Sequence, residues 1–213
     1  MFKSEVKDLG SVSLPAFTGT RVMMQPFRLD RVAWSLPNLR PWVDTICSLL
    51  SRLDELVTGV GYLTIDEAEV AAGETHRRPG LHVDGVGPDG DVGGWGGGGG
   101  AWSSCGMIVA ASHDGCQAWR QNFEGSPGRD GDCSHLASQL EDDALVRMCG
   151  GRAYWCSPLM VHASLALTQT TRRQFMRISM PSTAPWYEGY TLSPVGVMPT
   201  GPVHARRAGM SYR

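Results

Sequence analysis

The sequence predicts a mainly β fold, a double-stranded β-helix (jelly roll) with one or two flanking helices. Near the N-terminus, apolar residues recur at helical spacing and form one stripe. The rest of the chain alternates short β-branched or aromatic runs with turns rich in glycine and proline, and no internal repeat is visible. Many short strands behind a single helix are typical of two packed sheets braced by that helix.

The length of 213 residues and the hydrophobic content of 42% suit one domain with a sizeable core. We therefore expect a single domain over residues 1–213. Within it we expect an N-terminal arm and supporting helix over 1–57, a jelly-roll core over 58–182 and a C-terminal wrap over 183–213. Residues 1–25 are expected to form an irregular arm or an edge strand.

Charge and hydropathy limit the classes of molecule that this chain is expected to bind. The formal charge of −2 provides no basic field, so charge gives no indication of nucleic-acid binding. No apolar run approaches the ~18–20 residues that span a bilayer, and the N-terminus resembles no signal peptide. Six cysteines without a CxxC pair are expected to be free thiols. The lack of a signal peptide favours a cytoplasmic location. We expect a small-molecule or peptide substrate and no membrane partner; charge does not indicate nucleic acid as a partner, nor does it exclude it.

The helix is expected over residues 38–57. Asn38 is a candidate N-cap, Pro41 suits a first turn, and Gly59 follows the end. Its apolar stripe consists of Val43, Ile46, Leu49, Leu50 and Leu53.

The strand-like segments begin after this helix. They are expected at 61–66, 81–84, 106–112, 116–123, 153–156, 160–167 and 173–180. A short helix is expected between Ser134 and Cys149, with Ser134 as its cap. Ten of the sixteen residues from Gly85 to Gly100 are glycine, so we expect a flexible loop that could close over a ligand as a lid.

The most informative motif is His82-Val83-Asp84, which is followed much later by His162. Residues at i and i+2 of a strand point to the same side, so His82 and Asp84 can act together. A histidine from a distant strand can complete one face of an octahedron. Two histidines and one carboxylate in this arrangement are typical of non-haem Fe(II) sites, which keep the other face open.

A second motif, Arg177-Ile178-Ser179, lies on the last predicted strand. Alternation places Arg173, Phe175, Arg177 and Ser179 on one face of that strand. A hairpin that turns near residues 168–171 would bring Arg177 or Ser179 beside His162. The guanidinium fork matches a carboxylate with two parallel hydrogen bonds.

In these motifs, residues 60–182 resemble the Fe(II)/2-oxoglutarate-dependent dioxygenases. The resemblance implies that His82, Asp84 and His162 bind Fe(II). It also implies that Arg177 and Ser179 hold the distal carboxylate of 2-oxoglutarate. Arg173, eleven residues after His162, stands at the other position that an anchoring arginine takes in this family. The interval from Asp84 to His162 is wider than in compact members.

The resemblance implies an oxygenase that hydroxylates its substrate while 2-oxoglutarate is decarboxylated to succinate. One alternative is a cupin-type metalloenzyme with the same ligands but no 2-oxoglutarate, which an Arg177 pointing away from the metal would favour. Another is a non-catalytic binding or scaffold protein on the same fold.

The remaining candidates are expected to have ordinary structural roles. They are loop, turn, helix-start and tail histidines (His76, His113, His135 and His204), a buried strand cysteine (Cys156) and core side chains that could also project into the barrel (Tyr62, Trp119, Gln121 and Tyr154).

Overall fold

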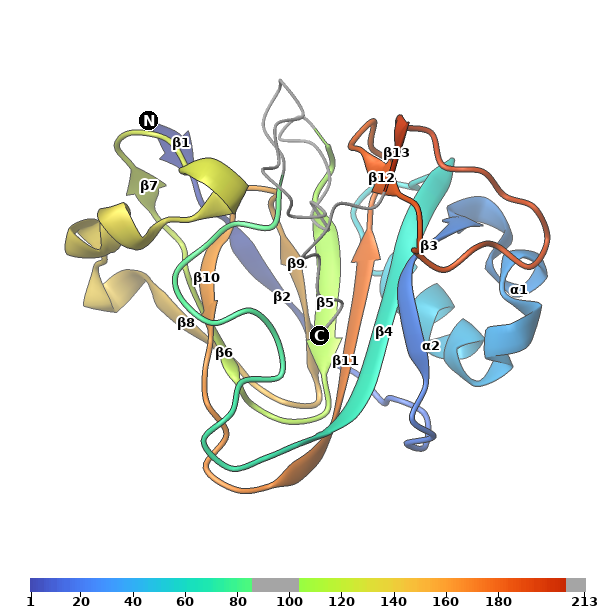
Figure 1. Ribbon diagram of the computed structural model, residues 1–213, viewed down its shortest axis with the longest axis horizontal. Helices are drawn as coiled ribbons and strands as arrows, with labels where there is room; N and C mark the ends of the chain where they lie inside the picture. Colours follow the sequence, from blue (N-terminus) through green and yellow to red (C-terminus); the bar gives the residue numbers. More distant parts are fainter. Residues whose placement is uncertain (86–103, 206–213) are drawn as a thin grey trace.

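Two facing antiparallel sheets form the centre of the fold, as the computed structural model shows for residues 1–85 and 104–205 (Figure 1). The major sheet has six strands in the order β2-β9-β5-β11-β4-β3, and the minor sheet has three in the order β10-β6-β8. This jelly-roll-like arrangement confirms the predicted fold class. The strands of the major sheet are β2 (Val6–Ser11), β3 (Arg21–Arg28), β4 (Val60–Val70), β5 (Met107–Ala111), β9 (Arg152–Cys156) and β11 (Thr171–Ser179). Those of the minor sheet are β6 (Cys116–Trp119), β8 (Leu145–Met148) and β10 (Val161–Ser164).

Helices cover the outer face of the major sheet (Figure 1). They are α1 (Val32–Ser35), a 3-10 turn (Pro37–Leu39) and α2 (Arg40–Leu50). The predicted stripe is confirmed, because Ile46 and Leu49 are fully buried in one cluster with Leu63 and Ile178 of the sheet.

The predicted ends of this helix were wrong. Asn38 lies in the 3-10 turn and caps nothing, and the helix ends at Leu50 rather than at residue 57. Beyond that end, the Arg52 guanidinium donates to the backbone carbonyls of Leu9 and Ser11. This contact ties the chain to β2 in place of a further helical turn.

Strand β11 separates the core from the interior of the barrel. Met176 and Ile178 pack toward the helices, whereas Arg173, Phe175 and Arg177 line the pocket between the sheets. The predicted division of faces is therefore right for these residues. The predicted hairpin was wrong: β10 belongs to the minor sheet and β11 pairs with β4 and β5.

Residues 1–25 form strands and not only an irregular arm. β2 and β3 are the two edge strands of the major sheet, so the edge-strand expectation is confirmed. Two further strand pairs lie outside the main sheets: β1 (Phe2–Lys3) with β7 (Asn122–Phe123), and β12 (Trp186–Tyr187) with β13 (Val203–His204).

Residues 134–149 differ from the single helix that was expected. They form two 3-10 turns (Ser134–Gln139 and Asp142–Ala144) followed by strand β8. Ser134 is no cap, because its hydroxyl donates to Asp132. In the C-terminal segment, the Trp186 indole donates to the Met24 carbonyl at 2.8 Å. This hydrogen bond fixes the tail against β3, an edge strand of the major sheet.

The predicted glycine-rich loop lies, from residue 86 onward, outside the described residues. Within the described ranges, no helix combines the length and the apolar character that a bilayer span requires.

We expect Ile46→Ala to lower the free energy of unfolding by about 2–5 kcal/mol, because it opens a cavity between α2 and the major sheet. Cys47→Ala on the exposed side of the same helix is the matched control, with an expected change within about 0.5 kcal/mol. Chemical denaturation of both variants measures the difference. Equal midpoints would contradict a bracing role for α2.

Candidate metal centre

The His82 segment is held as an extra strand beside β10. The backbones of His82 and His162 exchange two hydrogen bonds of 2.9 Å. On the other side, the Val83 amide donates to the Gly131 carbonyl. Gly131 has a φ of +74°, and a Cβ there would lie 2.4 Å from the Val83 carbonyl oxygen. Glycine is therefore required where this strand is enclosed.

This pairing brings three candidate ligands together. One donor atom each from His82, Asp84 and His162 lies within 4.8 Å of the other two. Asp84 Oδ1 is 3.8 Å from His82 Nε2 and 3.9 Å from His162 Nε2. These distances are too long for hydrogen bonds. All three residues are buried, so the group is a preformed cluster and not a chance gathering on the surface.

Backbone carbonyls fix the orientation of both imidazoles. His82 Nδ1 lies 2.8 Å from the Gly80 carbonyl, and His162 Nδ1 lies 3.0 Å from the Met160 carbonyl. A carbonyl only accepts, so each Nδ1 carries the proton and each Nε2 carries the lone pair. Burial and the neighbouring His162 lower the pKa of His82 to about 3, although Asp84 opposes this shift. His82 is therefore neutral at physiological pH, as a metal ligand must be.

Asp84 divides its two oxygens between different partners. Oδ1 faces the two histidines, and Oδ2 accepts a hydrogen bond of 2.6 Å from Arg177 Nη1. Burial alone would raise the pKa of Asp84, but the adjacent Arg177 guanidinium outweighs burial and holds this pKa well below its usual range. The carboxylate is thus ionised and leaves one oxygen for a cation.

The donor set suits a divalent first-row transition metal. Two imidazoles and one carboxylate are donors that Fe(II), Co(II) and Ni(II) accept. Three protein donors converge here, fewer than the six positions of an octahedral metal ion. Such a set leaves other coordination positions for exogenous ligands.

Arg177 and Ser179 do not form the open carboxylate grip that their spacing suggested. Arg177 Nη1 is engaged by Asp84, and Nη2 lies 3.8 Å from the Met24 sulfur. Ser179 is fully buried and is not among the described residues that line the pocket. Arg177 instead holds a candidate ligand in position.

Arg173 has a different environment. Its side chain lines the same pocket and the residue is only 3% exposed. Nε donates to the His113 carbonyl at 3.2 Å, and Nη1 donates to His76 Nδ1 at 3.1 Å. No carboxylate within the described ranges forms an ion pair with Arg173. A buried guanidinium without a counter-charge is expensive, which makes it a candidate anion site.

His76 is the residue that the sequence interpretation missed. It was expected in a loop, but its ring is buried between Arg173 and Asp66, with Nε2 at 3.5 Å from Asp66 Oδ2. Because Nδ1 accepts from Arg173, the proton lies on Nε2 and faces Asp66. Burial by itself would raise the pKa of Asp66. Contacts with His76, Arg77 and Arg21 outweigh burial and hold this pKa well below its usual range. The only early signal was a histidine next to two arginines.

The other candidates fall into structural roles. His113 is exposed and bonds to Ser112, and Asp114 accepts from the Gly150 amide. Burial raises the pKa of Cys156 well above its usual value, so it remains a thiol and no nucleophile. Tyr154 lines the pocket, whereas Tyr62 bonds to Thr200 in the tail.

The remaining side chains bond or pack away from the pocket. His135 bonds to the Ser126 carbonyl, Gln121 bonds to the Gln139 carbonyl, His204 is exposed beside Tyr187, and Trp119 packs in a separate apolar cluster.

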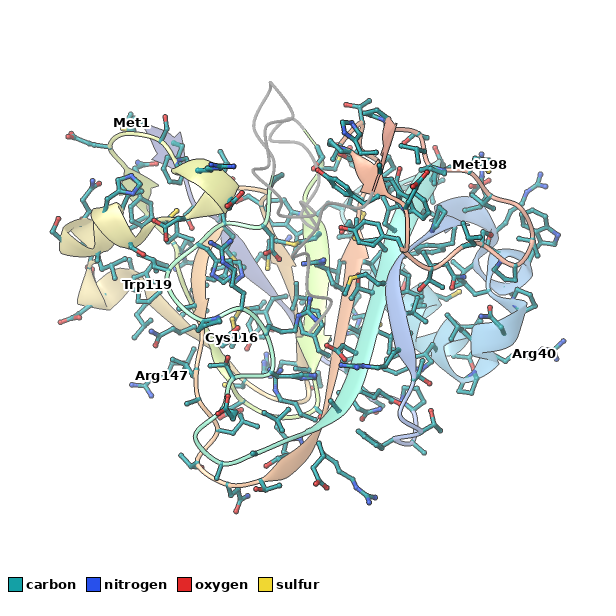
Figure 2. All side chains as sticks on the ribbon, in the orientation of Figure 1. Met1, Arg40, Cys116, Trp119, Arg147 and Met198 are labelled. Atoms are coloured by element: carbon teal, nitrogen blue, oxygen red, sulfur yellow. The ribbon has the colours of Figure 1, made fainter. Side chains whose placement is uncertain are left out.

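The pocket lies between the two sheets. Figure 2 shows Cys116 of β6 on the side of the minor sheet that faces the major sheet, with Arg147 at the outside. Burial raises the pKa of the Cys116 thiol to about 12. The pocket wall is otherwise largely apolar, with side chains from both sheets: Met107, Val109, Met148, Met160 and Phe175.

No protein-family profile and no curated protein matches this chain. Among solved structures, it is similar to the non-heme monooxygenase ThoJ in its apo form (17% identity, TM-score 0.43, 78% of this chain and 65% of that chain). The ThoJ–Ni complex gives 16% identity and a TM-score of 0.42, over 80% of this chain and 66% of that chain. AviO1 from Streptomyces viridochromogenes Tue57 has 14% identity and a TM-score of 0.37, over 86% of this chain and 76% of that chain. This chain spans just under two thirds of the length of ThoJ. Structural similarities this distant do not indicate a function, so the function of this chain has to be argued from its own residues.

We expect His82→Ala, Asp84→Ala and His162→Ala each to abolish stoichiometric binding of Fe(II) or Co(II), because each removes one of three ligands from one site. His135→Ala, an exposed histidine away from the site, is the control and should bind metal as the wild type does. Metal content after anaerobic loading and desalting measures this. Wild-type metal content in all three variants would rule out the cluster as a metal centre.

We expect Arg177→Gln to destabilise the metal-free protein by about 3–5 kcal/mol, because Asp84 is left buried and unpaired. Added Co(II) should restore part of this loss, since the cation supplies the missing positive charge. Chemical denaturation with and without Co(II) tests both statements. Arg152→Gln is the control, because Arg152 pairs with Asp8 at the surface and should contribute under about 1 kcal/mol. Equal losses in the two variants would contradict the role given to Arg177.

Proposed function

We propose that this chain is an Fe(II)- and 2-oxoglutarate-dependent oxygenase that hydroxylates its substrate. One observation carries the proposal: a buried pocket combines a three-donor cation site with Arg173, a buried guanidinium that forms no ion pair with a described carboxylate. A metal and an anionic co-substrate would satisfy both features at once.

His82, Asp84 and His162 would hold the metal. Bound Fe(II) would supply the redox chemistry with oxygen that no side chain provides. The chain's own contribution is positional: backbone carbonyls orient the imidazoles, and Arg177 holds Asp84 Oδ2 so that Oδ1 faces the site. The methionine-rich wall keeps bulk water away from the reacting groups.

Arg173 is the better candidate for the 2-oxoglutarate anchor. Arg177 is engaged with Asp84, and Ser179 lies away from the pocket lining. The His113 carbonyl and the His76 ring hold the Arg173 guanidinium in place through Nε and Nη1. A dicarboxylate that reaches from the metal to Arg173 would neutralise this buried charge.

In the proposed reaction, one atom of O₂ goes to succinate and the other to the substrate, while 2-oxoglutarate loses CO₂. The substrate would be a small molecule or a peptide. The free cysteines favour a reducing compartment such as the cytoplasm.

A second candidate function has one observation in its favour. Because Arg177 and Ser179 offer no open carboxylate grip, a cupin-type metalloenzyme could use the same three ligands without 2-oxoglutarate. Arg177 points toward the cluster and not away from it, which is the arrangement we expect of the oxygenase. Titration with 2-oxoglutarate separates the two functions.

We expect Arg173→Lys to weaken 2-oxoglutarate binding about thirty- to a thousand-fold, because lysine keeps the charge but loses the planar fork. Calorimetric titration of the Fe(II)-loaded protein without oxygen measures the affinity. Arg177→Lys is the matched control on the same strand, with an expected change under about fivefold.

The outcomes separate the assignments. If Arg177→Lys is crippled and Arg173→Lys is not, the anchor is the Arg177–Ser179 pair of the original motif. If the metal-loaded wild type binds no 2-oxoglutarate at all, the oxygenase proposal fails and the second candidate gains.

A further inference from the structure

The pocket carries more positive charge than a metal centre and its co-substrate require. Five arginines line it: Arg77, Arg78, Arg152, Arg173 and Arg177. Among the described residues that line the pocket, Asp84 is the one carboxylate. Arg152 is balanced from outside by Asp8 at 2.7 Å, and Arg177 is balanced by Asp84. The proposed co-substrate would balance Arg173.

Two arginines remain: Arg78 donates to the Asp130 backbone carbonyl, and Arg77 shares its carboxylate partner with other groups. Its Nη1 donates to Asp66 Oδ2 at 2.8 Å. The same carboxylate also pairs with Arg21 at 3.1 Å and with the His76 ring. Two guanidinium groups therefore share one negative charge, and the region keeps a net positive charge.

The geometry of Arg77 favours a ligand over a purely structural role. The guanidinium carbon lies 5.0 Å from the centre of the Phe175 ring, which fixes its plane against the pocket wall. Within the described part of the chain, Nε and Nη2 donate to no protein group, so two donors are available for an oxyanion. The side chain is 16% exposed, in contrast to Arg173, where the whole residue is 3% exposed.

The two arginines have different surroundings, since Arg77 contacts Asp66 and Phe175 and Arg173 contacts His113 and His76. In the proposed function, Arg173 is occupied by the co-substrate. The Arg77 side chain keeps a small exposed fraction. The Arg77 guanidinium lies against Phe175, and the same pocket is lined by the apolar side chains of Met107 and Val109 on the major sheet.

We infer that the substrate of this enzyme is a small amphiphilic anion, with its carboxylate, sulfonate or phosphate bound by Arg77 and its apolar body against the methionine-lined wall. This inference rests on the proposed function, since it takes the metal and 2-oxoglutarate to occupy the rest of the pocket. The uncharged end of the substrate would then face the His82–Asp84–His162 cluster.

The test uses two probes of equal size, hexanoate and hexanamide, on the protein loaded with Fe(II) and saturated with 2-oxoglutarate without oxygen. Wild type should bind hexanoate at least about tenfold more tightly than hexanamide, as a hydrogen bond to a charged group implies. Arg77→Gln should abolish this preference and leave 2-oxoglutarate affinity within about threefold. Arg77→Lys, which keeps the charge, should retain most of it.

Arg21→Gln is the matched control. Arg21 pairs with the same Asp66, but its side chain is 61% exposed and does not line the pocket, so hexanoate should bind as in wild type. Equal affinity of hexanoate and hexanamide, no hexanoate binding to wild type, or hexanoate affinity unchanged in Arg77→Gln would overturn the inference. So would competition between hexanoate and 2-oxoglutarate. If 2-oxoglutarate does not bind but the preference for hexanoate still depends on Arg77, the anion site stands and the proposed oxygenase function fails.

Discussion

The Asp84 carboxylate is the group on which the arrangement of the pocket depends. It is buried and ionised, so it needs positive partners, and it has them on two sides: Arg177 at Oδ2 and the histidine pair at Oδ1. Arg177 comes from the major sheet and the histidines from the minor sheet and its added strand. One carboxylate thus joins the two layers of the fold at the point where we place the metal.

The rest of the fold serves to keep these charged groups apart from water. Helix α2 covers the outer face of the major sheet, so alternate residues of β11 divide between an apolar core and the pocket. Each buried arginine that faces inward is expensive without a partner. Asp84 compensates Arg177, and Asp66 with His76 supports the region around Arg77 and Arg173. The incomplete balance of charge is the physical reason to expect anionic ligands.

Local pattern was enough to predict much of the fold. The helical stripe, the main strands after residue 60 and the two faces of β11 follow from periodicity, which is a property of neighbouring residues. The short strand β8 was missed because a charged, turn-rich segment precedes it, and the helix end was wrong because Arg52 ties the chain to β2. The hairpin was wrong because nothing local shows that the chain crosses between sheets.

The candidate site was predictable as a set of residues but not as a set of contacts. His82 and Asp84 were found from their spacing and His162 from the order of the motif and the family resemblance, and the structure brings the three together. The partner of Arg177 lies 93 residues away in sequence, and the setting of His76 depends on β4 and β11 together. Such pairings are decided by tertiary packing, so the motif alone assigned Arg177 the role of anion anchor.

Anomalous diffraction from crystals grown with one equivalent of Co(II) tests the central claim most directly. We expect a single anomalous peak bonded to Nε2 of His82, Nε2 of His162 and Oδ1 of Asp84, with Oδ2 still paired with Arg177. A peak at any other group of residues, or full occupancy of a site that lacks Asp84, would contradict it.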